Sequence, residues 1–346
     1  MNWDRRVRIS FTRVPAGALE RFLDFARYGR DLGYDRLWIP DQTYYADPFA
    51  LLAAVAVAVP GLDLGLAVTN PYTRHPVQIA RGAATVAALC KGRFLLGLGA
   101  GNRTHVLERL GIDGSQAAFR VREATILIRR LLRGETVHHD GTWTLRGVRL
   151  EQEVPSDVPI LIGTRNPRML RVAGEVADGV LLEALVTPEA QAYGLSQVST
   201  GARGAGRPVD GWEVVAWQTV VVTDDRSAAV ENLRTWAAHL LGMTTRPVAL
   251  RMGIRGDVID ALHARFREGG AETARDLVGP DEVDRVAIVG DPDTVATRCA
   301  ALVRGGATDI TVQVWADDAV GRETLRRFAE EVGARVRDAA AGERRP

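Results

Sequence analysis

The fold is decided by the stretch Pro159–Ala184, which reads PILIGTRNPRMLRVAGEVADGVLLEA. An apolar run ends at Gly163, and after a short polar turn Asn166 and Pro167 suit the N-cap and the first position of a helix. Apolar residues then recur at intervals of three and four, which predicts one buried helix face: Met169, Val172, Ala173 and Val176. A second apolar run, 180–182, follows. Strand, helix and strand in this order predict the βαβ unit of a parallel sheet.

The start of this helix also predicts a phosphate site. The first backbone N–H groups of a helix have no partner inside the helix, and Arg165 stands beside them. Such a helix start can hold a phosphate. The alternative is an ordinary turn with a solvated arginine, and the spacing alone leaves both open.

Length and composition limit the class of protein. The chain has 346 residues, of which 46% are hydrophobic, enough for one α/β barrel with insertions or for two domains. The net charge is +1 without dominant charged runs, which argues against a nucleic-acid partner. Two cysteines give no disulfide framework, and we find neither a signal peptide nor an apolar run long enough to cross a membrane. We therefore expect a soluble cytoplasmic protein.

Strand and helix patterns alternate along the chain. Eight apolar runs predict strands at 7–12, 36–39, 62–69, 93–99, 160–162, 180–182, 212–223 and 309–314. A hairpin around Asp140-Gly141 interrupts the alternation near 137–150, residues 225–285 read as mostly helical, and 201–208 reads as a mobile, linker-like loop. Because the strands are apolar on both faces, we predict a closed (β/α)8 TIM-like barrel forming one domain over 1–346. A doubly wound sheet with a helical domain is the rival.

In such a barrel, functional residues lie at the carboxyl ends of the strands. That rule selects 11–12, 41–42, 68–72, 99–103, 163–166, Glu183 and Gln218. Asp41 could exchange a proton or hydrogen-bond a cofactor ring, and a helix cap or a salt bridge is the alternative. The polar segment 69–76, with its two prolines, is explained equally well by plain turn chemistry.

Two further patterns bear on the chemistry of the chain. The segment 97–102 lacks the last glycine of GxGxxG, since Asn102 stands in its place. Its glycines allow a flat ring to approach the backbone, or they serve a tight turn. His138 and His139 are neighbours in a strand and point to opposite sides, so we expect no metal site. No GxSxG or CxxC motif is present.

Three segments together carry a family resemblance: 68–76 (VTNPYTRHP), 92–101 (GRFLLGLGAG) and 159–180. By their order and spacing, the chain resembles the bacterial-luciferase-like superfamily of flavin- and deazaflavin-dependent oxidoreductases. The first segment is most similar to the methylenetetrahydromethanopterin-reductase-like branch, which uses the deazaflavin coenzyme F420. The resemblance covers nearly the whole chain, and 290–292 and 305–307 fit it as well.

The resemblance implies a TIM-like barrel with the hairpin insertion and a cofactor site across several strand ends. Asp41 would lie by the ring, and Ala67, Val68 and Thr69 would form a bulge against it, followed by Asn70. A cis peptide bond is implied between the first two residues of that bulge. The remaining implied contacts are Gly99, Gly101 and Asn102 around the ring, and Gly163, Thr164, Arg165, Asn166 and Pro167 around the phosphate.

One position departs from the pattern. Many relatives carry histidine after the strand-two aspartate, where this chain has Gln42, and glutamine cannot shuttle a proton near neutral pH. The implied proton donor is then Asp41, Glu183 or His75, and we expect Asp41. The expected catalytic set is Asp41, Gln42 and Glu183.

The implied activity is hydride transfer between reduced F420 and a small organic substrate with a C=C, C=N or carbonyl group. An FMNH2-dependent monooxygenase of the same fold is the first alternative, because a flavin in this site would allow oxygen chemistry. A catalytically silent cofactor-binding protein is the second. The resemblance also implies a homodimer.

Overall fold

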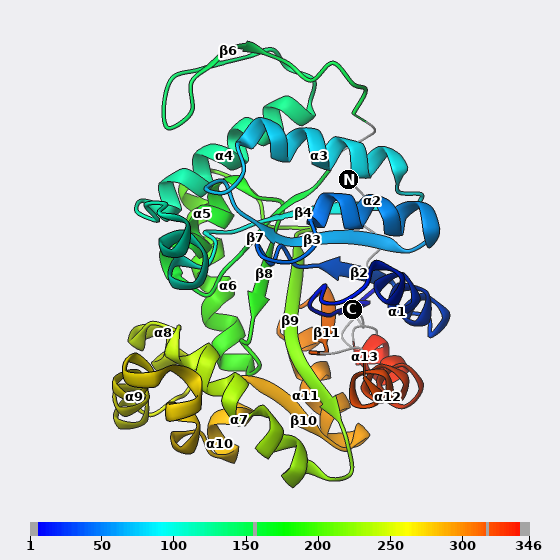
Figure 1. The fold of residues 1–346 in the computed structure, drawn as a ribbon, viewed down its shortest axis with the longest axis vertical. Coiled ribbons are helices and arrows are strands. Elements are labelled where there is room, and N and C mark those ends of the chain that lie inside the picture. Colours follow the sequence, from blue (N-terminus) through cyan, green and yellow to red (C-terminus); the bar gives the residue numbers. More distant parts are fainter. Residues whose placement is uncertain (1–5, 155–157, 316–317, 340–346) are drawn as a thin grey trace. The chain divides into compact units, whose positions relative to one another are not determined.

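A computed structural model describes residues 6–154, 158–315 and 318–339. The chain divides into two compact units. The first consists mainly of Ser10–Leu181 with Gln197–Val214, and the second of Leu182–Ser196 with the described residues from Val215 onward. Figure 1 follows the chain through both.

The main sheet has nine strands: β1 (Arg8–Thr12), β2 (Arg36–Ile39), β3 (Asp63–Thr69), β4 (Phe94–Leu98), β7 (Ile160–Gly163), β8 (Gly179–Glu183), β9 (Glu213–Val222), β10 (Ala287–Gly290) and β11 (Asp309–Gln313). Their order is β10-β9-β11-β1-β2-β3-β4-β7-β8, and β9 also pairs with β8. Eight strands therefore close on themselves while β10 flanks β9. The predicted (β/α)8 barrel is confirmed.

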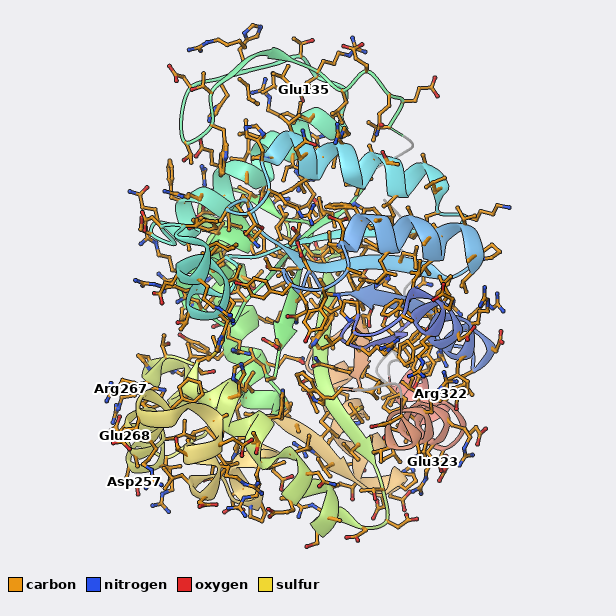
Figure 2. The ribbon with its side chains drawn as sticks, viewed as in Figure 1. Glu135, Asp257, Arg267, Glu268, Arg322 and Glu323 are labelled. Carbon is orange, nitrogen blue, oxygen red and sulfur yellow. The ribbon has the colours of Figure 1, made fainter. Side chains whose placement is uncertain are left out.

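Helices follow the strands as the alternation predicts. In the first half they are α1 (Leu19–Asp31), α2 (Pro48–Ala58), α3 (Pro76–Leu89), α4 (Ala117–Leu132) and α5 (Pro167–Val176). Later come α6 (Pro188–Gly204), α7 (Arg226–Gly242), α8 (Arg246–Arg251), α9 (Gly256–Ala274), α10 (Pro280–Asp284), α11 (Pro292–Arg304), α12 (Ala319–Arg327) and α13 (Gly333–Ala339). Charged side chains such as Arg267 and Glu268 of α9 lie on the outside of the second unit (Figure 2). In the described part of the chain, no helix is long and apolar enough to span a membrane.

Several helices begin with the same device. A side-chain acceptor occupies the N-cap and proline follows at the first helical position, as at Asp47 before α2, Asn166 before α5 and Asp291 before α11. The acceptor takes N–H groups that the helix leaves without partners, and proline loses nothing because it has no N–H. The positions of these helices could therefore be predicted from sequence.

Strand β10 was missed by the sequence analysis. Its four residues pair in parallel with β9, from Ala287 opposite Thr219 to Gly290 opposite Val222. An apolar run this short cannot be told from part of a buried helix by periodicity. The sequence prediction of a mostly helical 225–285 holds for α7 to α10, and Gly269 and Gly270 break the helical backbone within α9.

The predicted mobile loop at 201–208 is corrected for its first half, because α6 continues to Gly204. A Cβ on Gly201 would overlap the carbonyl oxygen of Arg171 in α5, and one on Gly174 would overlap the carbonyl oxygen of Val198. These glycines let the two helices approach each other closely. Glycine here serves packing rather than flexibility.

The amino ends of three strands in the first unit are joined by buried charges. Arg36 of β2 is fully buried, with Nη1 2.8 Å from Glu213 Oε1 and Nη2 3.7 Å from Asp63 Oδ2. Its guanidinium also lies 5.2 Å from the ring centre of Trp38, and a Cβ on Gly65 would overlap that ring. An ion cluster and a tryptophan therefore fill the inner face of β1 to β3 below the strand ends.

The predicted hairpin is present as β5 (Val137–His139) and β6 (Leu145–Val148), paired antiparallel. In Figure 1 it projects beyond α3 and α4, away from the strands. The buried carboxylate of Glu123 on α4 holds it, since Oε1 lies 2.5 Å from His139 Nε2 and accepts a hydrogen bond from the Thr142 amide. The hairpin is therefore anchored by polar contacts to one helix.

Candidate cofactor site at the strand ends

The carboxyl end of β3 carries the predicted bulge. The peptide bond between Ala67 and Val68 is cis, as the resemblance implied. The register between β3 and β4 shifts between Leu66 and Thr69 at the same place. This irregularity turns the backbone of the strand end away from plain sheet geometry.

Glycines of the neighbouring strands make room for Val68. A Cβ on Gly99 would lie 2.6 Å from Val68 Cγ2, and one on Gly163 would lie 2.6 Å from Val68 Cγ1. A Cβ on Gly97 would lie 3.0 Å from Val68 Cγ1. The sequence interpretation gave Gly97 and Gly99 to an approaching ring or to a tight turn, and the resemblance gave Gly163 to the phosphate site. In the structure, a Cβ on Gly99 or Gly163 would meet Val68 first, whereas one on Gly97 would meet the Leu66 carbonyl oxygen first.

Asp41 follows β2 and is held by two donors. Thr69 Oγ1 donates to Asp41 Oδ2 at 2.7 Å, and Arg74 Nε lies 3.4 Å from the same oxygen. The Asp41 side chain is only 4% exposed, and its Oδ2 faces both a hydroxyl donor and a guanidinium. Its other oxygen, Oδ1, makes no hydrogen bond to any residue that the structure describes. The carboxylate is therefore held in place through Oδ2.

Arg74 was missed as a site residue, although it lies in the segment that carried the resemblance. Its Nη2 lies 2.6 Å from Asp47 Oδ2, so one guanidinium joins Asp41 to the cap of α2. Burial lowers the pKa of Arg74, but the hydrogen bond to Asp47 and the charge of Asp41 outweigh that effect and raise the pKa above its ordinary value. Arg74 therefore stays charged and fixes the position of both carboxylates.

The loops after β3 and β4 use their predicted cofactor contacts internally. Asn70 is buried, and its Oδ1 accepts hydrogen bonds from the amides of Tyr72 and Thr73. Gly101 has a φ of +71°, and a Cβ there would lie 3.1 Å from Asn70 Cγ. Asn102 caps the next turn through the His105 amide. These residues therefore fix the backbone of the loops around the site, a role that a motif search does not reveal.

The predicted phosphate turn contains hydrogen bonds of its own. Asn166 Oδ1 accepts hydrogen bonds from the amides of Arg168 and Met169, and Thr164 Oγ1 accepts one from the Asn166 amide. The Thr164 amide donates to the Leu181 carbonyl. The predicted N-cap is therefore present, and it occupies the amides of Arg168 and Met169. A phosphate would rely mainly on side chains of the turn.

The remaining predicted catalytic residues are accessible. Gln42 is exposed, and its backbone amide and carbonyl form the turn after β2. Glu183 is the last residue of β8, is also exposed, and belongs to the second unit. His75 caps α3, with its Nδ1 accepting the Val77 amide, so that nitrogen is already used.

Thr12 ends β1 and was selected only by the strand-end rule. It lies opposite Trp38 of β2, two residues before Pro40. The Thr12 side chain is fully buried, and its hydroxyl makes no hydrogen bond to a described residue.

Other groups in the described ranges offer no rival chemistry. Burial raises the pKa of Cys299 to about 12, and burial also raises that of Cys90, so neither thiol is activated. Across 6–154, 158–315 and 318–339, no three histidine, cysteine or acidic side chains are grouped to hold a metal ion.

Comparison with known proteins agrees with the barrel fold. The family model described as luciferase-like monooxygenase matches residues 7–309. The 5,10-methylenetetrahydromethanopterin reductase of Archaeoglobus fulgidus is 31% identical over 83% of this chain and 87% of its own. The F420-dependent glucose-6-phosphate dehydrogenase of Microbacterium testaceum is 27% identical over 91% and 93%. The structure of the F420-dependent tetrahydromethanopterin reductase of Methanopyrus kandleri superposes with a TM-score of 0.81 at 26% identity, covering 95% of this chain and 99% of that one. The chain belongs to the luciferase-like monooxygenase family.

Proposed function

We propose that this protein is an F420-dependent oxidoreductase that transfers a hydride between the deazaflavin and a small organic substrate with a C=C, C=N or carbonyl group. Similarity to F420-dependent enzymes supports the cofactor. The observation that carries the site is the buried Asp41 carboxylate beside the β3 bulge. Its Oδ2 accepts a hydrogen bond from Thr69, and its Oδ1 makes no hydrogen bond to a described residue.

The donor set suits a deazaflavin ring. Asp41 Oδ1 can accept a ring N–H, while the half-buried Val68 offers an apolar surface for the flat ring. Ala67, Thr69 and Asn70 complete that side, and Gly99, Gly101 and Asn102 shape the adjoining loop. The side chains of Thr164, Arg165 and Asn166, beside Gly163 and Pro167, would hold the phosphate. When bound, the deazaflavin supplies or accepts the hydride at its ring carbon.

The protein residues must orient the reactants and deliver a proton. We propose that Asp41, whose Oδ2 is held by Thr69 and Arg74, orients the ring through its Oδ1 rather than donating the proton, the role first expected of it. Glu183 is exposed at the end of β8 and is the proposed donor, and Gln42 is proposed to hydrogen-bond the substrate. Glu183→Gln should then lower turnover without changing the affinity for F420.

The proposed assembly and location rest on the same family relationship. We propose that the chain acts in the cytoplasm as a homodimer, with residues 1–346 working as one functional domain. Light scattering on the purified protein tests the dimer, and a monomer at all concentrations would remove it.

The activity is tested by anaerobic oxidation of reduced F420 in the presence of a panel of alkenes, imines and carbonyl compounds. Loss of the reduced cofactor with one acceptor class supports hydride transfer. Oxygen consumption with FMNH2 and inertness toward reduced F420 would favour the monooxygenase alternative. No turnover with either cofactor, despite binding, would favour the catalytically silent protein.

A further inference from the structure

The buried hydroxyl of Thr12 lacks a partner where most such groups have one. A buried hydroxyl without a hydrogen bond costs roughly 1–3 kcal/mol, so native proteins rarely keep one without a reason. Thr12 is fully buried, and its Oγ1 bonds to no residue of the described chain. A valine would fill almost the same space without that cost.

The neighbours of Thr12 fix the direction of its side chain. On one side, Phe11 packs against α1, where a Cβ on Gly29 would overlap the phenyl ring. On the other side, the Arg13 guanidinium lies 4.8 Å from the ring centre of Phe22 and 5.0 Å from that of Phe25. Arg13 Nη1 also donates to the Ala16 carbonyl at 3.2 Å. Because side chains alternate along a strand, two residues anchored on α1 leave Thr12 pointing to the inner face.

The inner face is filled below Thr12. In the register of the sheet, Thr12 lies opposite Trp38, and Ser10 lies opposite Arg36 of the buried ion cluster. The ion cluster therefore occupies the layer below, and Thr12 is the last residue of its strand. Asp41 follows on the neighbouring strand, three residues beyond Trp38. The hydroxyl thus stands at the strand-end level of the first unit, the level at which barrel enzymes bind their ligands.

We propose that Thr12 is a ligand-contacting residue whose hydroxyl hydrogen-bonds a neutral polar group, such as a carbonyl, of the bound cofactor or substrate. This inference rests on the proposed function for the identity of the ligand. The hydroxyl is kept for binding, at a cost to the stability of the free protein. The surrounding packing holds it in one orientation before the ligand arrives, which favours binding because no side chain must be ordered.

The test compares valine substitutions at two buried threonines of the first unit. Thr125 is also fully buried, but its Oγ1 donates to the Val121 carbonyl at 2.7 Å. Thr125→Val should lower the midpoint of urea unfolding, because it leaves that carbonyl with one bond fewer. Thr12→Val should leave the midpoint of the free protein unchanged or raise it. Loss of stability in Thr12→Val equal to that in Thr125→Val would overturn the proposal, since the hydroxyl would then be bonded in the free protein, for example to a buried water.

Ligand binding supplies the second readout. If the cofactor is the partner, Thr12→Val should raise the dissociation constant for F420 roughly threefold to tenfold. Thr12→Ser should restore the wild-type value. If the substrate is the partner, the F420 constant stays as in the wild type, while KM for the acceptor found in the panel rises by a similar factor and serine restores it. Unchanged values of both constants would overturn the proposal. Failure of the wild type to bind F420 would instead count against the proposed function, and the unfolding comparison would still stand.

Discussion

Val68 occupies the space that a side chain on Gly163 would need, since a Cβ there would lie 2.6 Å from Val68 Cγ1. The two residues come from β3 and β7, 95 positions apart in the chain numbering. Gly99 of the loop after β4 stands in the same relation to the other methyl group. The strand-end glycines and the bulge therefore pack against each other, and substitutions in either should change the affinity for the cofactor.

Gly163→Ala should displace Val68 and weaken F420 binding by about tenfold or more, because an overpacked core side chain typically costs about 1–3 kcal/mol. Gly204→Ala is the matched control, since a Cβ there meets nothing within 4 Å. Val68→Ala in the Gly163→Ala background should recover part of the affinity. Titration of each variant with F420 measures the effect, and equal affinity in Gly163→Ala and the control would contradict it.

Asp41→Asn keeps the size of the side chain and removes its charge. The amide can no longer serve as a charged acceptor, so F420 affinity should fall by roughly tenfold, as for loss of a charge-assisted hydrogen bond. Thr69→Val, which removes the donor to Oδ2, should have a smaller effect in the same direction. Wild-type affinity in Asp41→Asn would show that the carboxylate does not contact the cofactor.

The ion cluster at the amino ends of the strands should serve stability alone. Arg36→Met leaves Glu213 and Asp63 buried without their cation, which typically costs about 3–5 kcal/mol. Urea unfolding followed by circular dichroism gives this value. The folded fraction of the variant should bind F420 with wild-type affinity, and a change in that affinity would place the cluster in the site.

Lowering the pH should weaken the contact between Glu123 and the hairpin. Burial raises the pKa of Glu123, but hydrogen bonds from His139 and Thr142 outweigh it and leave the pKa below its ordinary value. A carboxyl group with a depressed folded-state pKa contributes stability above the unfolded pKa, near 4.3, and loses it as the pH falls through the folded value. Glu123→Gln should therefore be less stable than the wild type at pH 7 by about 1 kcal/mol. Thermal melts should show this difference shrinking as the pH falls below about 4. A difference independent of pH would contradict the assignment.

Much of the fold could be predicted because its signals are local. The cap and proline at Asn166-Pro167 place α5, and apolar runs flanked by polar turns place all eight closing strands. Strand β10 lacked such a signal, because its four residues are too few to show a hydrophobic periodicity. The sequence placed Gly201 in a mobile loop. In the folded chain this glycine allows α6 to approach α5 closely, a contact that the sequence alone does not show.

The site was harder to predict than the fold because its contacts join distant segments. Sequence pointed to Asp41 and to the bulge, yet the pairing of Asp41 with Arg74 joins residues 33 positions apart and is seen only in the folded chain. The capping role of Asn166 was predicted, and its side chain takes two of the amides at the helix start that the phosphate interpretation had also considered. The contacts of Glu183 and Gln42 with a substrate remain predictions.

The central claim is most directly tested by titrating the purified protein with F420 and, separately, with FMN, following binding by fluorescence quenching. We predict tight binding of F420 and weak binding of FMN, with the F420 affinity reduced in Asp41→Asn and Gly163→Ala. Tight binding of FMN and weak binding of F420 would contradict the deazaflavin assignment, and binding of neither would contradict the site at the β3 bulge.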